Sequence, residues 1–254
     1  MKNYTRIIMP VITLVLVLAL WEICVHVFSI SLYLLPAPSK IATSIIENAD
    51  ILWKHSLVTL KEAILGLIIA TIAAIIIAIG MDVSKTFKHS IFPHLIVTQT
   101  VPVMVLGPLF TIWLGFGLAP KVLMVVFMCF FPIAISFCDA LGNVDRHQMN
   151  LLRSFGAKKW QIYTMVKIPS ATPALFSGLK VAATYCIGGA IVGEWLSASA
   201  GLGYYMIRVK NGYMLDKVFA CVIIIIILSL MLHGIVVLLE KCLCPYQHIK
   251  EKKK

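Results

Sequence analysis

Apolar residues in this chain gather in six long windows, and polar and charged residues fill the segments between them. Each window is close to the about 20 apolar residues that a helix needs to cross a lipid bilayer. The pattern therefore predicts an all-α membrane protein with six transmembrane helices in a single domain, residues 1–254, and both termini on one side. The windows cover about residues 7–28, 57–79, 91–114, 122–137, 175–192 and 218–239.

The first window follows Lys2 and Arg6, an opening that a secretory signal peptide also has. Its apolar run reaches about Phe28 and is longer than the apolar region of a signal peptide, which has about 7–15 residues. No A-x-A-like cleavage site follows the run. We expect an uncleaved first membrane helix.

The composition agrees with residence in lipid, because 60% of the 254 residues are hydrophobic, 13% are charged, and the mean hydropathy is +0.95. Soluble proteins carry about 45–50% apolar and about 25% charged residues. A formal net charge of +11 is also typical of a nucleic-acid binder, but here Lys and Arg lie in short segments between the apolar windows. We therefore expect membrane lipid, and no nucleic acid, as a partner.

The distribution of Lys and Arg predicts the orientation in the membrane. The segments on the side of the N-terminus hold 14 of these residues, and the segments on the opposite side hold six. Positive residues are retained in the cytoplasm. Both termini are therefore predicted to be cytoplasmic.

The outer segment of residues 29–56 contains Pro36 and Pro38, which favour an extended turn, and then Ser39. We expect Ser39 to cap a short interfacial helix that runs to about Asp50. Glu62 lies near the outer end of the next window, where a charged side chain normally reaches the interface. We assign Glu62 no function.

The third window is interrupted by Pro102, Gly107 and Pro108. A broken helix persists in lipid only where neighbouring protein or a water-filled path satisfies the freed backbone groups. The residues fit two interpretations, a kinked packing helix and a broken helix that lines a transport pathway.

The longest cytoplasmic segment between windows, about residues 139–172, is basic and too polar to enter the bilayer. Two short helices are predicted in it, over Gln148–Phe155 and Lys158–Lys167, separated by Gly156, which permits positive φ. Each has an apolar face that fits packing either on the membrane domain or on a cytoplasmic partner. These faces include Leu151, Leu152 and Phe155 in the first helix and Trp160 and Val166 in the second.

This segment resembles the signature of binding-protein-dependent ABC importer permeases, E-A-A-x3-G-x9-I-x-L-P. Gly156, nine further residues and Val166-Lys167-Ile168-Pro169 match its second half, whereas Asn150-Leu151-Leu152 stands where E-A-A is expected. Other blocks resemble the nitrate, sulfonate, taurine and pyrimidine-precursor branch of that family. They are Leu34–Ser39, Thr100–Pro102 with Gly107-Pro108, Trp113–Gly117, Gly156–Gln161, Pro173–Lys180 and Val192–Trp195.

The resemblance implies the type I ABC importer permease fold in a bacterial cytoplasmic (inner) membrane. It also implies three protein partners: cytoplasmic ABC ATPase subunits, an extracytoplasmic substrate-binding protein and a second copy of the chain. The cytoplasmic segment is then a coupling-helix region that docks into the ATPase and transmits its motion. Carried over, the docking residues are Asn150, Leu151, Leu152, Phe155, Gly156, Ala157, Trp160, Val166, Ile168 and Pro169.

Glu194 lies at the outer end of the fifth window, within the Gly-Glu block that resembles the family. A carboxylate at membrane depth is costly enough to indicate function, whereas at the interface water solvates it at small cost. The resemblance favours a role in an external gate or in docking of the binding protein. We take Glu194, with Pro102, Gly107 and Pro108, as candidates for the pathway or gate.

No catalytic site is predicted. The sequence has no G-x-x-x-x-G-K-[ST] motif, no H-E-x-x-H motif and no paired carboxylates. Its seven cysteines and its histidines show no metal-ligand spacing, so no metal site is expected. We expect no cofactor on this chain, with ATP and Mg²⁺ bound by the partner ATPase.

The function predicted from these features is that of the membrane permease of an ATP-driven importer. The resemblance points first to a thiamine-type pyrimidine precursor as the solute, and then to a sulfonate or nitrate. The alternative, an ion-coupled secondary transporter, normally shows inverted repeats and deep charged residues, and neither is clear in this sequence.

Overall fold

A computed structural model describes the backbone of residues 2–244 and the side chains of residues 8–244 except Ser197. Every element of this described part is helical. The helices are α1 (Lys2–Val27), α2 (Pro38–Glu47), α3 (Ala49–Val83), α4 (Lys85–Gln99), α5 (Val103–Leu114), α6 (Leu118–Gly142), α7 (Arg146–Ser154), α8 (Lys159–Ile162), α9 (Ile168–Ser197), α10 (Leu202–Asn211) and α11 (Leu215–Leu243), with one π-helical turn at Tyr163–Lys167.

Five helical stretches of the described residues are long and apolar enough to cross a membrane, and the pair α4 and α5 supplies a sixth if it is one broken span. The two helices of that pair bend by 105° at the break. The prediction of an all-α membrane protein is therefore confirmed. The five stretches are Ile8–Val27, Ala49–Val83, Leu118–Gly142, Lys159–Leu196 and Leu215–Leu243.

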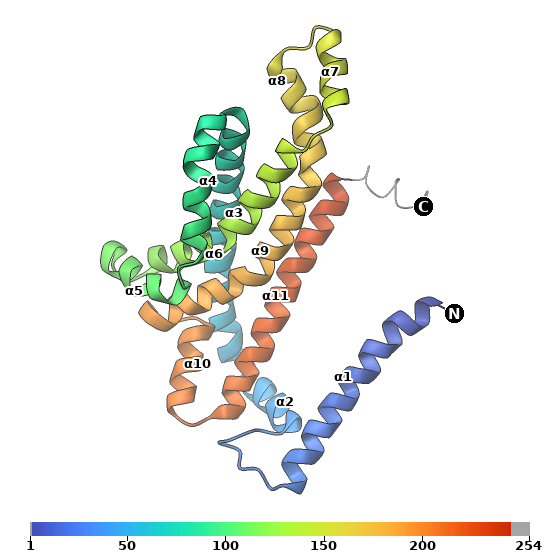
Figure 1. Ribbon diagram of the computed structural model, residues 1–254. Helices are drawn as coiled ribbons and strands as arrows, with labels where there is room; N and C mark the ends of the chain where they lie inside the picture. Colours follow the sequence, from blue (N-terminus) through green and yellow to red (C-terminus); the bar gives the residue numbers. More distant parts are fainter. Residues whose placement is uncertain (1, 245–254) are drawn as a thin grey trace.

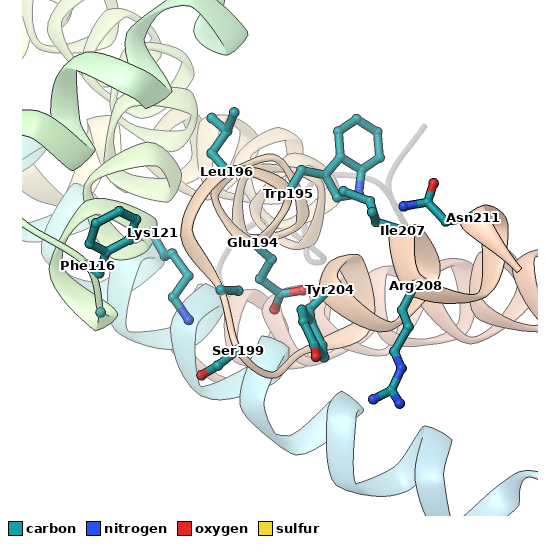
Figure 2. Close-up of a pocket in the computed structure, with 12 residues that line it drawn as sticks. Phe116, Lys121, Glu194, Trp195, Leu196, Ser199, Tyr204, Ile207, Arg208 and Asn211 are labelled. Carbon is teal, nitrogen blue, oxygen red and sulfur yellow. The ribbon is translucent and has the colours of Figure 1, made fainter.

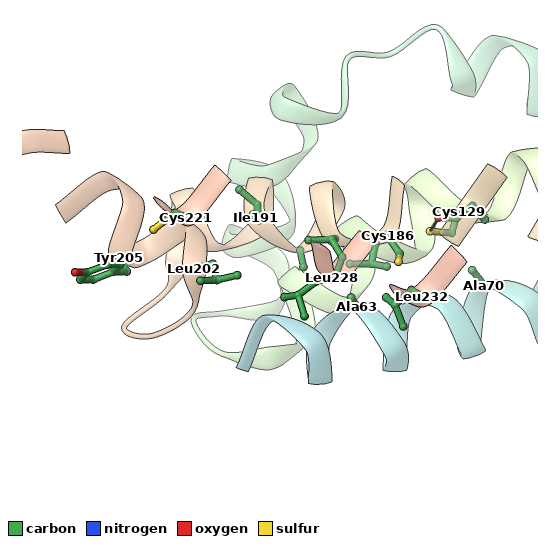
Figure 3. Packing of buried hydrophobic residues seen from close by; sticks show 14 of the residues in the cluster. Ala63, Ala70, Cys129, Cys186, Ile191, Leu202, Tyr205, Cys221, Leu228 and Leu232 are labelled. Atoms are coloured by element: carbon green, nitrogen blue, oxygen red, sulfur yellow. Dashed lines mark hydrogen bonds between the residues drawn. The ribbon is translucent and has the colours of Figure 1, made fainter. Parts of the chain in front are cut away.

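The centre of the bundle is formed by α6 and α9, with α3 and α11 packed beside them (Figure 1). The buried cluster between these helices is rich in small residues, among them Ala63, Ala70 and Cys186 (Figure 3). Small side chains let helix backbones approach closely, which is how helices pack where lipid removes the hydrophobic driving force. Gly178 marks the closest approach to the backbone of another helix among the described glycines, because a Cβ there would lie 2.5 Å from the Pro132 carbonyl oxygen of α6.

The first helix leans away from the rest of the bundle (Figure 1). It is held at its C-terminal end, where the Trp21 ring lies 5.7 Å from that of Phe219. The Glu22 carboxylate accepts hydrogen bonds from the Ser39 backbone N–H at 3.0 Å and from the Ser39 hydroxyl at 2.7 Å. Most of the remaining apolar side chains of α1 are exposed.

The prediction that Ser39 caps α2 is wrong. The helix begins two residues earlier, with Ala37 in the N-cap position and Pro38 as the first helical residue, and it ends at Glu47. Proline suits that first position because its fixed φ matches the helix and its missing N–H is not needed there. Ser39 then lies inside the first turn and binds Glu22 of α1.

The break in the third window lies at residues 100–102, since α4 ends at Gln99 and Pro102 occupies the N-cap position of α5. Gly107 and Pro108 lie inside α5 and do not interrupt it. Gly107 instead makes room for α9, because a Cβ at this position would overlap the Leu196 side chain.

Candidate functional site

The turn between α7 and α8 projects beyond the bundle at the end opposite α2 and α10 (Figure 1). Asp145 begins α7 by accepting a hydrogen bond from the His147 N–H at 2.8 Å. Gly156 ends it with φ +76. The Gly156 N–H donates to the Arg153 carbonyl at 2.9 Å and the Ala157 N–H donates to the Leu152 carbonyl at 3.0 Å, the pattern of a Schellman motif. The predicted glycine bend is therefore present.

The helix after this turn continues into the bundle. From Lys159, α8, the π-turn and α9 form one stretch of 38 residues that reaches Leu196. At 1.5 Å per residue this stretch is about 57 Å long, well beyond the about 30 Å of bilayer hydrocarbon. The projecting turn and the opposite end of the bundle thus belong to one rod.

The predicted docking residues divide into two groups. Leu151, Phe155 and Trp160 project apolar side chains into solvent, and Phe155 is 79% exposed; we call these three residues the apolar tip. Asn150 and Gly156 are also exposed, beside the tip. The others are partly buried: Leu152 and Ala157 lie next to the turn, while Val166, Ile168 and Pro169 lie in the rod where it enters the bundle.

At the other end of the bundle, Glu194 is 2% exposed, although it is ionisable. Its carboxylate accepts hydrogen bonds from the Thr59 hydroxyl at 2.6 Å and from the Gly203 N–H at 2.5 Å. The Thr59 hydroxyl also accepts a hydrogen bond from the Leu202 N–H at 2.8 Å, and His55 Nδ1 accepts one from the Gly201 N–H at 3.0 Å. Three successive N–H groups at the start of α10 are therefore bound by α3 and α9.

A buried ion pair lies beside Glu194. The Lys121 ammonium of α6 pairs with the Glu62 carboxylate of α3, and Glu62 is 1% exposed. The expectation that Glu62 reaches the interface is wrong, because Lys121 offers it an opposite charge inside the bundle. We call Thr59, Glu62, Lys121 and Glu194 the outer cluster, after the side of the membrane on which the distribution of Lys and Arg predicts this end of the bundle to lie.

A cavity of about 710 Å³ opens next to the outer cluster, between the end of α9, α10 and the loop before α6. Figure 2 shows Glu194 projecting from α9 between Lys121 and Tyr204, with Arg208 of α10 on the rim. The cavity therefore combines one carboxylate with two cations and a phenol. Polar groups of this kind in a concave site can hold a small polar solute.

The pathway candidates fall in different places. Glu194 lines the cavity, and Gly107 touches Leu196, which lines it too. Pro102 and Pro108 are not among the residues described around the cavity. Within the described residues, no three His, Cys, Asp or Glu side chains come together in a way that would hold a metal ion.

The α3 residues that bind this end of α9 and the start of α10 were missed in the sequence. Thr59, which donates to Glu194, and His55, which accepts from the Gly201 N–H, precede Glu194 by more than 130 residues, and nothing in a local pattern connects them. Opposite charges near the outer ends of two apolar windows, on Glu62 and Lys121, were the one available signal.

Residues 66–243 match the family described as binding-protein-dependent transport system inner membrane component. A probable ABC transporter permease protein of Haemophilus influenzae is 32% identical over 90% of this chain and 93% of its own length. The formylaminopyrimidine transport permease protein ThiX of Halalkalibacterium halodurans is 30% identical over 97% of this chain and 99% of its own. The crystal structure of an amino acid ABC transporter with histidines superposes with a TM-score of 0.64 at 19% identity, over 78% of this chain and 97% of that one.

Proposed function

The chain belongs to the family of binding-protein-dependent transport system inner membrane components, and from this premise we propose that it forms the solute pathway of an ATP-driven importer. It is an ABC importer permease with the type I permease fold. The proposal adds the source of energy, the partners and the solute. The observation that carries it is the apolar tip, exposed on a rod that reaches the outer cluster.

The apolar tip is proposed to dock on a cytoplasmic ATPase, which binds ATP and Mg²⁺. Leu151, Phe155 and Trp160 gain about 25 cal/mol for each Å² of apolar surface that a partner covers. Exposed aromatic side chains held on a short rigid turn are the residue type that dominates protein interfaces. Gly156 fixes the angle between the two helices that carry them.

We also propose an orientation of the chain in the membrane. If the apolar tip faces the cytoplasm, both termini are cytoplasmic, and α2, α10 and the cavity face outward. This agrees with the excess of Lys and Arg, 14 against six, on the side of the tip. The extracytoplasmic binding protein then delivers solute at the end where Arg208 and Glu194 lie, and Glu194 belongs to the outer gate.

A second copy of the chain is proposed to complete the pathway. The apolar residues of α1 and the apolar surface of α5 lie exposed in the single chain, and lipid or another copy must cover them. ATP binding would draw the two apolar tips together and open the path outward, which makes the docked segment the point where energy enters.

The solute is proposed to be a thiamine-type pyrimidine precursor. The support is the relative named for formylaminopyrimidine, which matches along almost its full length. The cavity is compatible, since the hydrogen-bonding groups of Glu194, Tyr204 and Arg208 suit a small polar heterocycle. A sulfonate or nitrate is the second expectation, in which case the two cations of the cavity dominate.

Two matched variants test the docking. Trp160→Ser, at the apolar tip, is expected to lower co-purification of the ATPase at least about fivefold, because the docking anchor is lost. Trp53→Ser, at the other end of the molecule, is the control, since the two tryptophans are 63% and 65% exposed. Equal retention of the ATPase by both variants would contradict the docking.

Transport is tested in vesicles that contain the permease, its ATPase and its binding protein. Uptake of radiolabelled formylaminopyrimidine is expected to require ATP and to resist an ionophore. Uptake that persists without ATP and collapses with the ionophore would instead establish the ion-coupled alternative. A binding protein that retains taurine or nitrate but not the pyrimidine would move the solute to the second class.

A further inference from the structure

An ion pair joins the C-terminal end of α3 to the rod. Neither of its two residues is among the predicted docking residues. The Lys167 ammonium binds both oxygens of the Asp82 carboxylate, at 2.8 and 2.6 Å. Both side chains are largely buried, with 16% of Lys167 and 7% of Asp82 exposed. A pair so placed is held more firmly than a surface pair, and removing one partner leaves a buried charge.

The lysine of the pair lies in the one π-helical turn of the described residues. This turn, Tyr163–Lys167, joins α8 to α9, and Lys167 is its last residue. A π-turn inserts an extra residue and weakens the regular hydrogen-bond ladder, so it is a place where a helix can bend. The Asp82 carboxylate therefore binds the rod at the turn where the helix can bend.

The surroundings of the pair leave the Lys167 ammonium little choice of partner. A cavity of about 300 Å³ adjoins it, and Asp82 is the one acidic residue among those described around that cavity. Arg153 and Lys159 also line it. The Lys167 ammonium lies 5.0 Å above the Tyr163 ring, a cation–π contact that holds the lysine side chain in place.

The helix that carries Asp82, α3, extends to the outer cluster. With 35 residues, α3 is about 52 Å long at 1.5 Å per residue. Asp82 lies in its last turn, and Thr59 and Glu62 lie in its outer half, where they meet Glu194 and Lys121. The projecting turn is thus connected to the outer cluster twice, through α9 directly and through α3 by way of the ion pair.

We infer that Asp82 and Lys167 are a positioning pair that makes α3 move together with α9 when the apolar tip moves. This inference rests on the proposed docking of the tip on an ATPase. The outer cluster joins side chains of both helices, so it opens in a defined way only if both helices receive the motion. Without the pair, the π-turn bends, α9 moves alone, and ATP hydrolysis loses its link to solute uptake.

The test measures solute taken up per ATP hydrolysed by the complete transporter in vesicles. For Asp82→Asn and Lys167→Met we expect an unchanged ATPase rate and a ratio about tenfold lower, within the usual range of coupling between sites. Lys167→Arg, which keeps the charge, is expected to retain the wild-type ratio. Glu240→Gln is the control, because the Lys180–Glu240 pair of 2.9 Å joins α9 to α11 and not to α3.

Each outcome decides the matter. A normal ratio in Lys167→Met, or an equal fall in Glu240→Gln, overturns the positioning role. If the ratio of solute to ATP falls equally in Lys167→Arg and Lys167→Met, the positive charge of Lys167 does not cause the coupling. That result overturns the positioning role as well. If wild-type vesicles show no ATP-dependent uptake, the proposed function itself fails, which is distinct from failure of the pair alone.

Discussion

Replacing Thr59 by valine removes one hydroxyl from the outer cluster and keeps the shape of the side chain. That hydroxyl donates to the Glu194 carboxylate at 2.6 Å and accepts from the Leu202 N–H at 2.8 Å. A longer contact of 3.2 Å to the carbonyl of His55 competes for the same proton. The distances show that Glu194 receives it. Thr59→Val therefore leaves one acceptor and one donor short of a partner.

The magnitude follows from those two groups. A hydrogen bond to a charged acceptor contributes about 1.5–3 kcal/mol, and a buried N–H without an acceptor costs about 1–3 kcal/mol. The methyl group of valine returns about 0.8 kcal/mol in an apolar surrounding. The expected loss in the free energy of unfolding is therefore about 2–5 kcal/mol. At about 2–4 °C for each kcal/mol, the melting temperature falls by roughly 4–20 °C.

Thermal unfolding in detergent, followed by tryptophan fluorescence, measures this fall. Thr71→Val is the matched control on the same helix, since the Thr71 hydroxyl donates only to the Leu67 carbonyl of its own helix, at 2.7 Å. Such a bond adds little to stability, so we expect a change below about 1 kcal/mol for the control. Equal melting temperatures for the two variants would refute the role assigned to the Thr59 hydroxyl.

Three further changes test separate parts of the molecule. Lys121→Met leaves Glu62 charged and unpaired and is expected to cost about 3–5 kcal/mol in thermal unfolding, with Glu62→Gln in the same chain restoring most of it; no restoration would contradict the pairing. Gly156→Val is strained at φ +76 by about 1–2 kcal/mol and should reduce ATPase co-purification without changing the fold, and full retention would count against the bend. Gly178→Ala crowds the α6 backbone and should lower the melting temperature, whereas Gly234→Ala, with no atom within 4 Å of its added Cβ, should not; equal shifts would contradict the close approach.

The apolar windows identified the spanning helices because lipid cannot hydrogen-bond a backbone, so length and hydropathy suffice to find them. The ends of the helices carry no such signal. Residues 49–56 are polar enough to have been placed in an outer loop, yet they form the first turns of α3. The predicted cytoplasmic segment of about residues 139–172 contains Pro169, which lies at the start of α9, and Pro173 follows inside that helix, which continues through both.

Only part of the candidate site could be predicted from the sequence, for a related reason. Gly156 was found because a glycine between two amphipathic segments has a local meaning. Glu194 was found through its resemblance to a family block, whereas its partner Thr59 and the neighbouring His55 and Lys121 come from two other helices. A single sequence records local preference and says nothing of which helices become neighbours. The outer cluster therefore emerges only when the helices are packed.

The two sets of polar contacts lie at the two ends of α3 and α9, and the residues between them are of a different kind. Ala63, Ala70 and Ala74 of α3 share a buried cluster with Ala182 and Ala190 of α9. Contacts between small apolar side chains tolerate a slight displacement of one helix along another, whereas a short hydrogen bond or ion pair is either made or broken. The contacts between α3 and α9 can therefore shift gradually in the middle of the bundle, whereas the polar contacts at its two ends are either made or broken. A larger side chain in the middle should lower stability yet leave the ratio of solute to ATP unchanged in the protein that folds, while loss of a charge at either end should change that ratio itself.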